Sequence, residues 1–200
     1  MSPVHEPPQP GLRERKKAKT RAAIQAAALH LFKRHGYDAT TVDQIAELAE
    51  ISQSTFFRYF PTKEDVVLHD RYDPLLLADF RAQPAELSPI QALRRTLRSV
   101  LGTLPPEELA REHQRAMLIA SVQELRAHAL DQLASTLQPF TEAVAERTGR
   151  TVDDPAVLAL TGAVVGVSMS AMLTASQDAN ADYFELMDTA LAHLEAGLPI

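Results

Sequence analysis

Polar side chains suited to reading nucleic acid gather in one short stretch of the sequence. Gln53, Ser54 and Thr55 follow one another, and Arg58 comes three residues later. A glutamine amide pairs with the edge of adenine, a guanidinium pairs with guanine, and short hydroxyl side chains reach bases or phosphates. None of the four carries the negative charge that phosphates would repel. The stretch therefore predicts a surface that contacts double-stranded DNA.

Two short helices are predicted to hold this surface. The first covers 42–49, with Thr41 as its N-cap and Gln44 at the spacing of a capping box, which satisfies two free backbone N–H groups. Thr40 with Asp43 is an alternative shifted by one residue. The second covers 53–60 and begins after Ser52, a favoured N-cap residue. A three-residue turn joins them in the layout of a helix-turn-helix, whose second helix enters the major groove, about 12 Å wide. Free amides at both helix starts can bind phosphate oxygens.

A longer helix over 12–35 is predicted to support the pair. Its apolar side chains recur at the 3.6-residue repeat of one helix face, and Gly36 follows where a helix commonly ends. The residues of this face are Ile24, Ala27, Ala28, Leu31 and Phe32. The short helices offer a matching apolar set, Ile45, Ala49, Ile51, Phe56 and Phe60. We expect the two sets to pack together and to turn the polar residues of 53–58 outward.

Charge is distributed unevenly along the chain. The net charge is −6, yet residues 11–36 hold eight basic residues and one acid, whereas residues 71–200 hold ten basic and seventeen acidic residues. The basic residues that open the first helix are Arg13, Arg15, Lys16, Lys17, Lys19 and Arg21. Cations near a helix N-terminus oppose the helix dipole, so helix stability does not explain them. A polyanion such as DNA does, and a solvated basic tail is the alternative.

The same residues carry a resemblance to a known family. Segments 40–46 and 52–64 resemble, in residue type, order and spacing, the DNA-binding domain of TetR-type transcriptional regulators. The resemblance covers roughly residues 15–68. It implies an all-α homodimer with an N-terminal three-helix helix-turn-helix domain and a C-terminal helical domain for ligand binding and dimerisation. It also implies a repressor that binds an inverted-repeat operator and leaves the DNA when its ligand is bound.

The resemblance implies roles for individual residues. Thr41 and Gln44 match the end of the family's second helix that contacts the DNA backbone, and Lys63 falls on its phosphate-binding lysine. Phe57 and Tyr59 fall on an aromatic and a histidine position of the family. The complete predicted DNA-binding set is Thr41, Gln44, Ser52, Gln53, Ser54, Thr55, Phe57, Arg58, Tyr59 and Lys63, with Lys16, Lys17 and Lys19 from the basic run.

Two positions depart from the family pattern. Glu50 stands in the turn where the family usually has glycine. If this residue needs a positive φ, a side chain there costs about 1 kcal/mol. Phe57 replaces the usual tyrosine and therefore lacks a hydroxyl contact.

The rest of the sequence predicts a second helical domain. Helices are expected near 88–103, 105–126, 127–148, 154–177 and 180–196, and no stretch alternates as a strand would. A helix over 62–82, kinked or split at Asp73-Pro74, is expected to join the domains and to act as the lever between them. The predicted division is a disordered proline-rich tail over 1–10, a DNA-binding domain over 11–62, and a ligand-binding and dimerisation domain over 63–200.

Residues 155–177 form an uncharged segment long enough to span a membrane. Its small residues, its proline start and its lack of basic flanks instead favour a buried helix of a protein without a membrane partner. Gly162, Gly166 and Ser170 recur every four residues, which allows another helix to approach closely. We expect the helices near 154–177 and 180–196 to form a four-helix bundle with a second copy of the chain. A core helix within one chain is the alternative.

The predicted effector is a small apolar or acyl-type molecule. Segments 56–60 and 117–126 resemble a TetR subgroup whose ligand domains are associated with acyl-CoA-like effectors. We expect a cavity among the helices of 88–148, with His113 or Arg115 as its polar anchor. The predicted lining is His113, Met117, Leu118, Leu125, Leu133, Leu137 and Phe140. Side chains at this helical spacing also commonly form ordinary core.

Composition and motifs exclude several other functions. The chain has no cysteine, which excludes disulfides, zinc–thiolate sites and thiol catalysis. Its seven histidines are scattered, and it has neither a phosphate-cradling glycine loop nor a nucleophile elbow. We therefore expect no metal, no cofactor and no enzyme. The first ten residues lack the apolar core of a secretory signal, so a cytoplasmic protein is expected. The alternative function is a soluble carrier or sensor of apolar ligands whose helix-turn-helix does not bind DNA.

Overall fold

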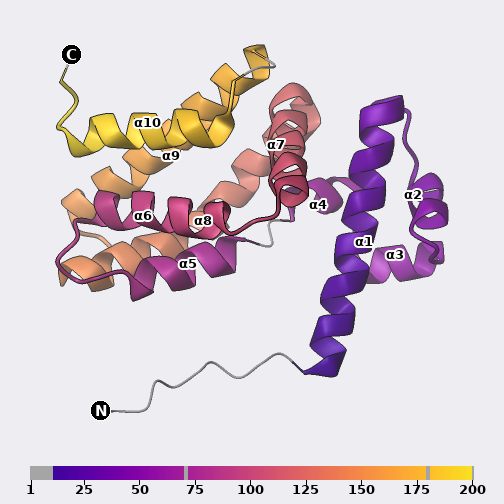
Figure 1. The fold of residues 1–200 in the computed structure, drawn as a ribbon, viewed down its shortest axis with the longest axis horizontal. Helices are drawn as coiled ribbons and strands as arrows, with labels where there is room; N and C mark the ends of the chain where they lie inside the picture. The colour runs from indigo at the N-terminus through magenta and orange to yellow at the C-terminus, as the bar shows by residue number, and fades with distance from the viewer. Residues whose placement is uncertain (1–10, 70–71, 179–180, 200) are drawn as a thin grey trace. The chain divides into compact units, whose positions relative to one another are not determined.

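The computed structural model describes residues 11–69, 72–178 and 181–199, except the side chains of 130–136 and 176. Within these ranges every regular element is an α-helix (Figure 1), which confirms the predicted all-α class. Two compact units follow one another along the chain: the first extends to Val66, and the second begins at Val67. The predicted proline-rich tail over 1–10 lies outside the described residues.

The first unit is built from α1 (Leu12–His35), α2 (Val42–Leu48), α3 (Gln53–Tyr59) and most of α4 (Lys63–Leu68). The bounds of α1 are those that the sequence predicts. α1 ends at Gly36, whose φ of +85° is a conformation that L side chains rarely adopt. The Gly36 N–H donates to the carbonyl of Phe32, 2.9 Å away.

The predicted core of the first unit is confirmed. Ile24 of α1, Ile45 of α2 and Phe56 of α3 are fully buried, and Phe32 and Phe60 are almost so. The ring centroids of Phe56 and Phe60 lie 6.1 Å apart, a separation typical of packed aromatic pairs. Ala27 and Ala28 of α1 are also buried. Half-burial is found for the other predicted members, Leu31, Ala49 and Ile51.

The second unit packs its helices around one apolar core. Its described helices are α5 (Asp73–Ala82), α6 (Pro89–Gly102), α7 (Pro106–Ser121), α8 (Gln123–Thr148), α9 (Pro155–Gln177) and α10 (Tyr183–Glu195). The core includes Phe80, Val144, Val157 and Leu191, one each from α5, α8, α9 and α10. α9 and α10 pack along each other (Figure 1).

The helix expected over 62–82 is split, as its proline predicts. α4 ends at Leu68, and α5 begins at Asp73 with Pro74 in its first turn. Proline tolerates the first helical turn because the N–H that it lacks has no partner there. Residues 70–71 between the two helices lie outside the described part of the chain.

The predicted boundary between helices at 126 and 127 is wrong. α7 ends at Ser121, Val122 has extended backbone with φ −93° and ψ 119°, and α8 begins at Gln123. A guanidinium N–H of Arg126, in the first turns of α8, donates to the carbonyl of Ala120 at the end of α7. This contact supplies a partner for a carbonyl that the helix end leaves free, and residue periodicity does not reveal it.

Arg147 of α8 closes the end of α5 and the connection that follows it. Its Nη2 donates to the carbonyls of Phe80 and Gln83, at 2.9 and 2.8 Å. Its Nη1 donates to the carbonyls of Pro84 and Leu87, at 2.8 and 3.4 Å. One guanidinium therefore serves four backbone oxygens that a helix end and its loop leave without helical partners.

Candidate nucleic-acid interface

The N-terminal end of α2 carries the predicted capping box. The hydroxyl Oγ1 of Thr41 accepts from the Gln44 N–H at 3.3 Å, and Oε1 of Gln44 accepts from the Thr41 N–H at 2.9 Å. Both side chains are exposed. The geometry of the cap is confirmed. The start of α2 therefore lies at the surface of the unit, with its cap formed by the chain's own side chains.

Ser52 caps α3 as predicted. Its Oγ accepts from the Thr55 N–H at 3.1 Å and donates to Oγ1 of Thr55 at 2.9 Å. The Ser54 hydroxyl lies 2.9 Å from Oγ of Ser52. Three hydroxyl groups therefore converge at the start of α3, and each is within reach of solvent. This cluster fixes their positions relative to the helix start.

α3 turns a polar face outward over an apolar base. Gln53, Ser54 and Arg58 are exposed, whereas Phe56 on the opposite side is fully buried. Phe57 is 47% exposed, and its ring meets the Phe56 ring edge-to-face with centroids 5.4 Å apart. Among the other predicted members of this face, half-burial is found for Thr55 and Tyr59. The short helix thus holds amide, hydroxyl and guanidinium groups on a rigid support.

The turn between α2 and α3 places a non-glycine residue in the left-handed region of the backbone. Glu50 has φ +54°, the left-handed conformation that favours glycine. The turn is nevertheless hydrogen-bonded: the Glu50 N–H donates to Glu47 at 3.1 Å, and the Ile51 N–H donates to Ala46 at 3.0 Å. Residue 50 therefore has the positive φ that was the condition for strain, and the glutamate side chain there carries a conformational cost.

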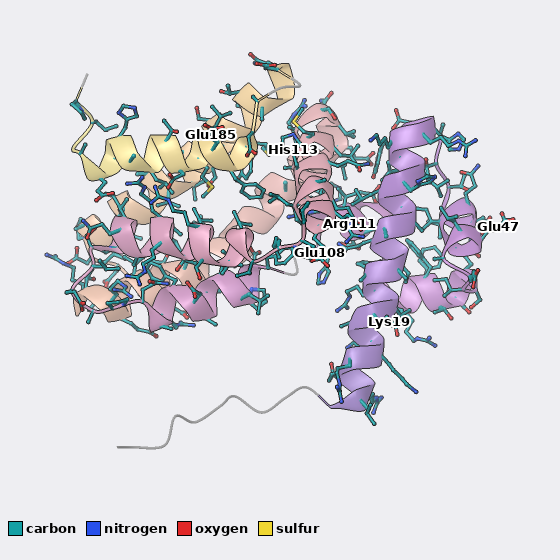
Figure 2. The ribbon with its side chains drawn as sticks, viewed as in Figure 1. Lys19, Glu47, Glu108, Arg111, His113 and Glu185 are labelled. Carbon is teal, nitrogen blue, oxygen red and sulfur yellow. The ribbon has the colours of Figure 1, made fainter. Side chains whose placement is uncertain are left out.

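The predicted basic residues lie on the exposed N-terminal turns of α1. Lys16, Lys17 and Lys19 are all exposed, as are Arg13 and Arg15. Figure 2 shows Lys19 on this part of α1. The cations are therefore available to a polyanion.

Lys63 occupies a different environment from the other predicted DNA-binding residues. Its Nζ donates to the carbonyl of Tyr37 at 3.0 Å and to the carbonyl of Thr40 at 3.3 Å. The same nitrogen lies 4.0 Å from the centroid of the Tyr37 ring. The resemblance assigns a phosphate to this lysine, but the structure places its ammonium group against the turn between α1 and α2.

Glu64, next to Lys63, contacts the same tyrosine. Its Oε1 accepts from the Tyr37 hydroxyl at 2.6 Å. Burial by itself raises the pKa of Glu64. The hydrogen bonds from Tyr37 and from a backbone N–H together lower the pKa by more than burial raises it, so the pKa lies below its ordinary value. Glu64 is therefore an ionised acceptor at neutral pH. Neither Tyr37 nor Glu64 was predicted from the sequence, because the hydrogen bond between them joins residues 27 positions apart.

The structure places the predicted ligand-binding residues in different surroundings. Leu125 is fully buried, and Phe140 packs on Phe80 with ring centroids 5.3 Å apart. Half-burial is found for Met117, Leu118 and Leu137, and the side chain of Leu133 lies outside the described residues. Arg115, the alternative anchor, pairs with Glu112 at 2.8 Å.

His113 is the predicted ligand-binding residue that lines a groove. The groove has a volume of about 400 Å³ and lies between α7 and the start of α10. Figure 2 shows His113 on α7 and Glu185 on α10. The lining residues are Pro106, Leu109, Ala110, His113, Ala181, Asp182 and Phe184. The α7 members repeat at helical spacing, which is the signal that could have located this face in the sequence.

α9 exposes an apolar face. Leu158 is 51% exposed and Leu173 is 44% exposed. A Cβ added to Gly162 or Gly166 would meet no atom within 4 Å. By length and composition Pro155–Ala175 could cross a membrane, and only 22% of its most apolar window is buried. The exposed face is therefore smooth and unusually apolar for a surface helix.

The described residues contain no candidate metal-binding cluster. Within residues 11–69, 72–178 and 181–199, no three or more histidine, aspartate or glutamate side chains form a group that could hold a metal ion.

A helical unit that presents a capped polar helix beside a basic one, followed by a larger helical unit, defines a DNA-binding transcription regulator of the helix-turn-helix class. Residues 24–69 match the family model described as bacterial regulatory proteins, tetR family. Residues 87–199 match the model described as MftR C-terminal domain. The chain belongs to the TetR family of transcription regulators.

Individual relatives agree with this assignment. The chain is 44% identical over 105 residues to the regulator TcmR of Streptomyces glaucescens, a match that covers 52% of this chain and 46% of TcmR. It is 27% identical over 187 residues to the putative mycofactocin biosynthesis regulator MftR of Mycobacterium tuberculosis, covering 92% and 93% of the two chains. The fold resembles Thermus thermophilus FadR, a repressor solved with lauroyl-CoA, with a TM-score of 0.52, 24% identity, and coverage of 90% and 95%.

Proposed function

We propose that the protein is a cytoplasmic, homodimeric repressor that binds an inverted-repeat operator and leaves it when a small apolar or acyl-type effector binds. The observation that carries this proposal is the exposed polar face of α3, where Gln53, Ser54 and Arg58 stand over the fully buried Phe56. An exposed amide, hydroxyl and guanidinium on one short helix are the groups that hydrogen-bond to base-pair edges.

The DNA contacts fall into two kinds. Gln53 and Arg58 of α3 contact base edges, and the hydroxyl groups at the start of α3 contact bases or phosphates. The capped start of α2 and the cations of α1 contact the phosphate backbone, which positions the unit without reading sequence. The exposure of Lys16, Lys17 and Lys19 supports this second role.

Dimerisation uses α9 and α10. The exposed apolar side chains Leu158 and Leu173, together with the open surface over Gly162 and Gly166, support a close helix–helix contact with a second copy. Burying this face against a protein removes apolar area from water, which favours association at roughly 25 cal/mol per Å². Two-fold symmetry then requires an operator with two-fold symmetry.

Effector release follows from linkage. An effector that binds the DNA-incompetent conformation more tightly shifts the population away from the operator, by no more than its difference in affinity for the two states. An acyl-type effector is supported by the FadR relative, whose structure contains lauroyl-CoA. The groove of about 400 Å³ beside His113, with its mostly apolar lining, supports an apolar ligand portion.

Selection of bound duplexes from a random pool tests the proposal. We expect enrichment of a palindromic sequence at low salt and steep loss of affinity as salt is added. Arg58→Ala should weaken binding to the selected duplex by about tenfold or more, since a bidentate base contact contributes about 1–3 kcal/mol of discrimination. Arg95→Ala, a change at an exposed cation of α6, is the matched control and should bind as the unaltered protein does.

Two results would contradict the proposal. Absence of binding to any duplex at low salt would favour the alternative, a carrier or sensor of apolar ligands. Enrichment of a sequence without two-fold symmetry would contradict the dimer, because two symmetry-related copies of α3 read two related half-sites.

A further inference from the structure

We propose that Phe57 reads thymine. Its phenyl ring packs on the 5-methyl group of one thymine in each half-site of the operator, and α3 therefore selects a T·A pair at that position. This inference deepens the proposed function and rests on it, because it concerns base recognition by the same helix. It assigns a base partner to a side chain that forms no hydrogen bond.

The first observation is the exposure of the ring. The seven phenylalanines and four tyrosines of the chain all lie within the described residues, and all of them except Phe57 are buried or half-buried. Phe57 is 47% exposed. Burial of apolar surface against another apolar group is favourable in water. About half of this ring is therefore available to an apolar group of a partner.

The second observation is the place of the ring among the polar groups of α3. Gln53 precedes Phe57 by four residues, so the two side chains lie on one face of the helix, about 6 Å apart along its axis. Gln53, Ser54 and Arg58 are exposed as well. The ring therefore belongs to the surface that we propose meets base-pair edges, and it faces the DNA when Gln53 does.

The third observation is the support beneath the ring. The Phe57 ring meets the Phe56 ring edge-to-face, with centroids 5.4 Å apart and ring planes at 87°. Phe56 is fully buried, and its ring lies 6.1 Å from that of Phe60, which is 2% exposed. An aromatic side chain with two rotatable bonds loses little conformational entropy when it is fixed. The core of the unit thus presents Phe57 as a rigid apolar contact.

The chemistry of the groove gives such a contact one partner among the four bases. A phenyl ring has neither a donor nor an acceptor for the polar edge of a base or for a phosphate. Thymine alone presents a methyl group in the major groove, and apolar side chains such as phenylalanine contact it. Transfer of one methyl group from water to an apolar contact changes affinity by about fourfold, hence by about fifteenfold for the two half-sites of a dimer.

Replacement of thymine by deoxyuridine tests the contact, because it removes the methyl group and keeps every hydrogen bond of the base pair. The duplex is the palindrome selected from a random pool, and each thymine of a half-site is replaced together with its symmetry mate. We expect one such pair at which the replacement weakens binding of the unaltered protein by about fifteenfold. Phe57→Ala should bind the thymine and the uracil forms of this duplex equally.

Two further variants separate the thymine contact from a general effect of substitution. Phe57→Tyr keeps the ring and should keep the preference for thymine over uracil. Leu48→Ala is the matched control, because Leu48 is 48% exposed and lies on α2 of the same unit. This variant should bind and discriminate as the unaltered protein does. A second selection with Phe57→Ala should return a palindrome in which that position is no longer fixed as T·A.

Three results would overturn the thymine contact while the repressor proposal stands, because the palindrome is still bound in each. The selected half-site contains no thymine, or no replacement by uracil changes affinity, or Phe57→Ala keeps the preference for thymine. Absence of binding to any duplex by the unaltered protein overturns both proposals. Should Phe57→Ala fail to fold, Phe57→Gln takes its place, and a preference for thymine that persists in that variant contradicts the inference.

Discussion

Arg94 of α6 and Asp188 of α10 form a two-point ion pair, with Nε 3.0 Å from Oδ1 and Nη2 3.4 Å from Oδ2. Arg98 joins them through Nη2, 2.7 Å from Oδ2 of Asp188. Arg94 also donates from Nη1 to Oε2 of Glu195 at 2.6 Å. The side chain of Arg94 is only 19% exposed. One arginine thus attaches two turns of α10 to α6, which fixes the helix that we assign to dimerisation.

Loss of this arginine should destabilise the second unit. In Arg94→Met, Asp188 and Glu195 lose a charged donor in a partly desolvated setting, so we expect the free energy of unfolding to fall by about 1–2 kcal/mol. Urea denaturation measures this as a lower midpoint with an unchanged slope. The control is Arg95→Met, a change at an exposed neighbour on α6, which should shift stability by less than about 0.5 kcal/mol. Equal midpoints for the two variants would show that the ion pair contributes nothing measurable.

The same ion pair predicts a dependence of stability on pH. The hydrogen bond from Arg94 is the main cause that lowers the pKa of Asp188, with Arg98 contributing and burial opposing. Because the folded pKa lies below the unfolded value of about 3.9, ionised Asp188 stabilises the fold above that value, and the contribution is lost as pH falls through the folded pKa. The difference in unfolding free energy between the unaltered protein and Asp188→Asn should be constant above about pH 5 and should shrink below about pH 4. Urea midpoints between pH 7 and pH 3 measure it, and a difference that grows toward low pH would reverse the sign.

Glycine at position 50 should stabilise the first unit. Glu50 has φ +54°, a conformation that costs a side chain about 1 kcal/mol and glycine almost nothing. Glu50→Gly should therefore raise the thermal midpoint, since the relief of strain exceeds the entropy that glycine adds to the unfolded chain. Ala23→Gly, at an exposed position inside α1, is the control and should lower stability by about 1 kcal/mol. If both variants lose stability, the strain assigned to Glu50 is wrong.

A bulky side chain on the exposed face of α9 should prevent dimerisation. A Cβ at Gly166 would meet no atom within 4 Å, so Gly166→Phe can be accommodated within one chain. A phenyl ring there would nevertheless separate two helices that pack through small residues. Sedimentation should give a monomer for Gly166→Phe and a dimer for the control Ser99→Phe, a change at an exposed position on α6. A dimer in both variants would place the interface elsewhere.

Local signals explain why much of the fold could be predicted from the sequence. The capping box at Thr41 and the proline at 155 involve only neighbouring residues, so the starts of α2 and α9 follow directly from them. The core of the first unit follows from apolar spacing on α1. The break at Val122 could not be predicted in the same way, because the contact of Arg126 with Ala120 depends on how two helices meet.

The candidate sites were predictable to different degrees. The outward side of α3 could be inferred because burial of Phe56 and Phe60 leaves Gln53 and Arg58 on the opposite face. Periodicity does not separate core from cavity, because side chains in both places recur at the same helical spacing. Leu125 has this spacing and is fully buried. The partners of Lys63 are backbone carbonyls 23 and 26 residues away. Every residue has a backbone carbonyl, so the residue types do not predict this contact.

The hydrogen bonds of Arg147 restrict which amino acids position 147 can accept. Its two terminal nitrogens donate to the carbonyls of Phe80, Gln83, Pro84 and Leu87. A lysine offers its three donors from a single point, and neither it nor any neutral residue can span four oxygens arranged around a planar fork. In a library that samples every amino acid at each codon, position 147 should tolerate arginine alone, although it lies far along the chain from the residues proposed to touch DNA.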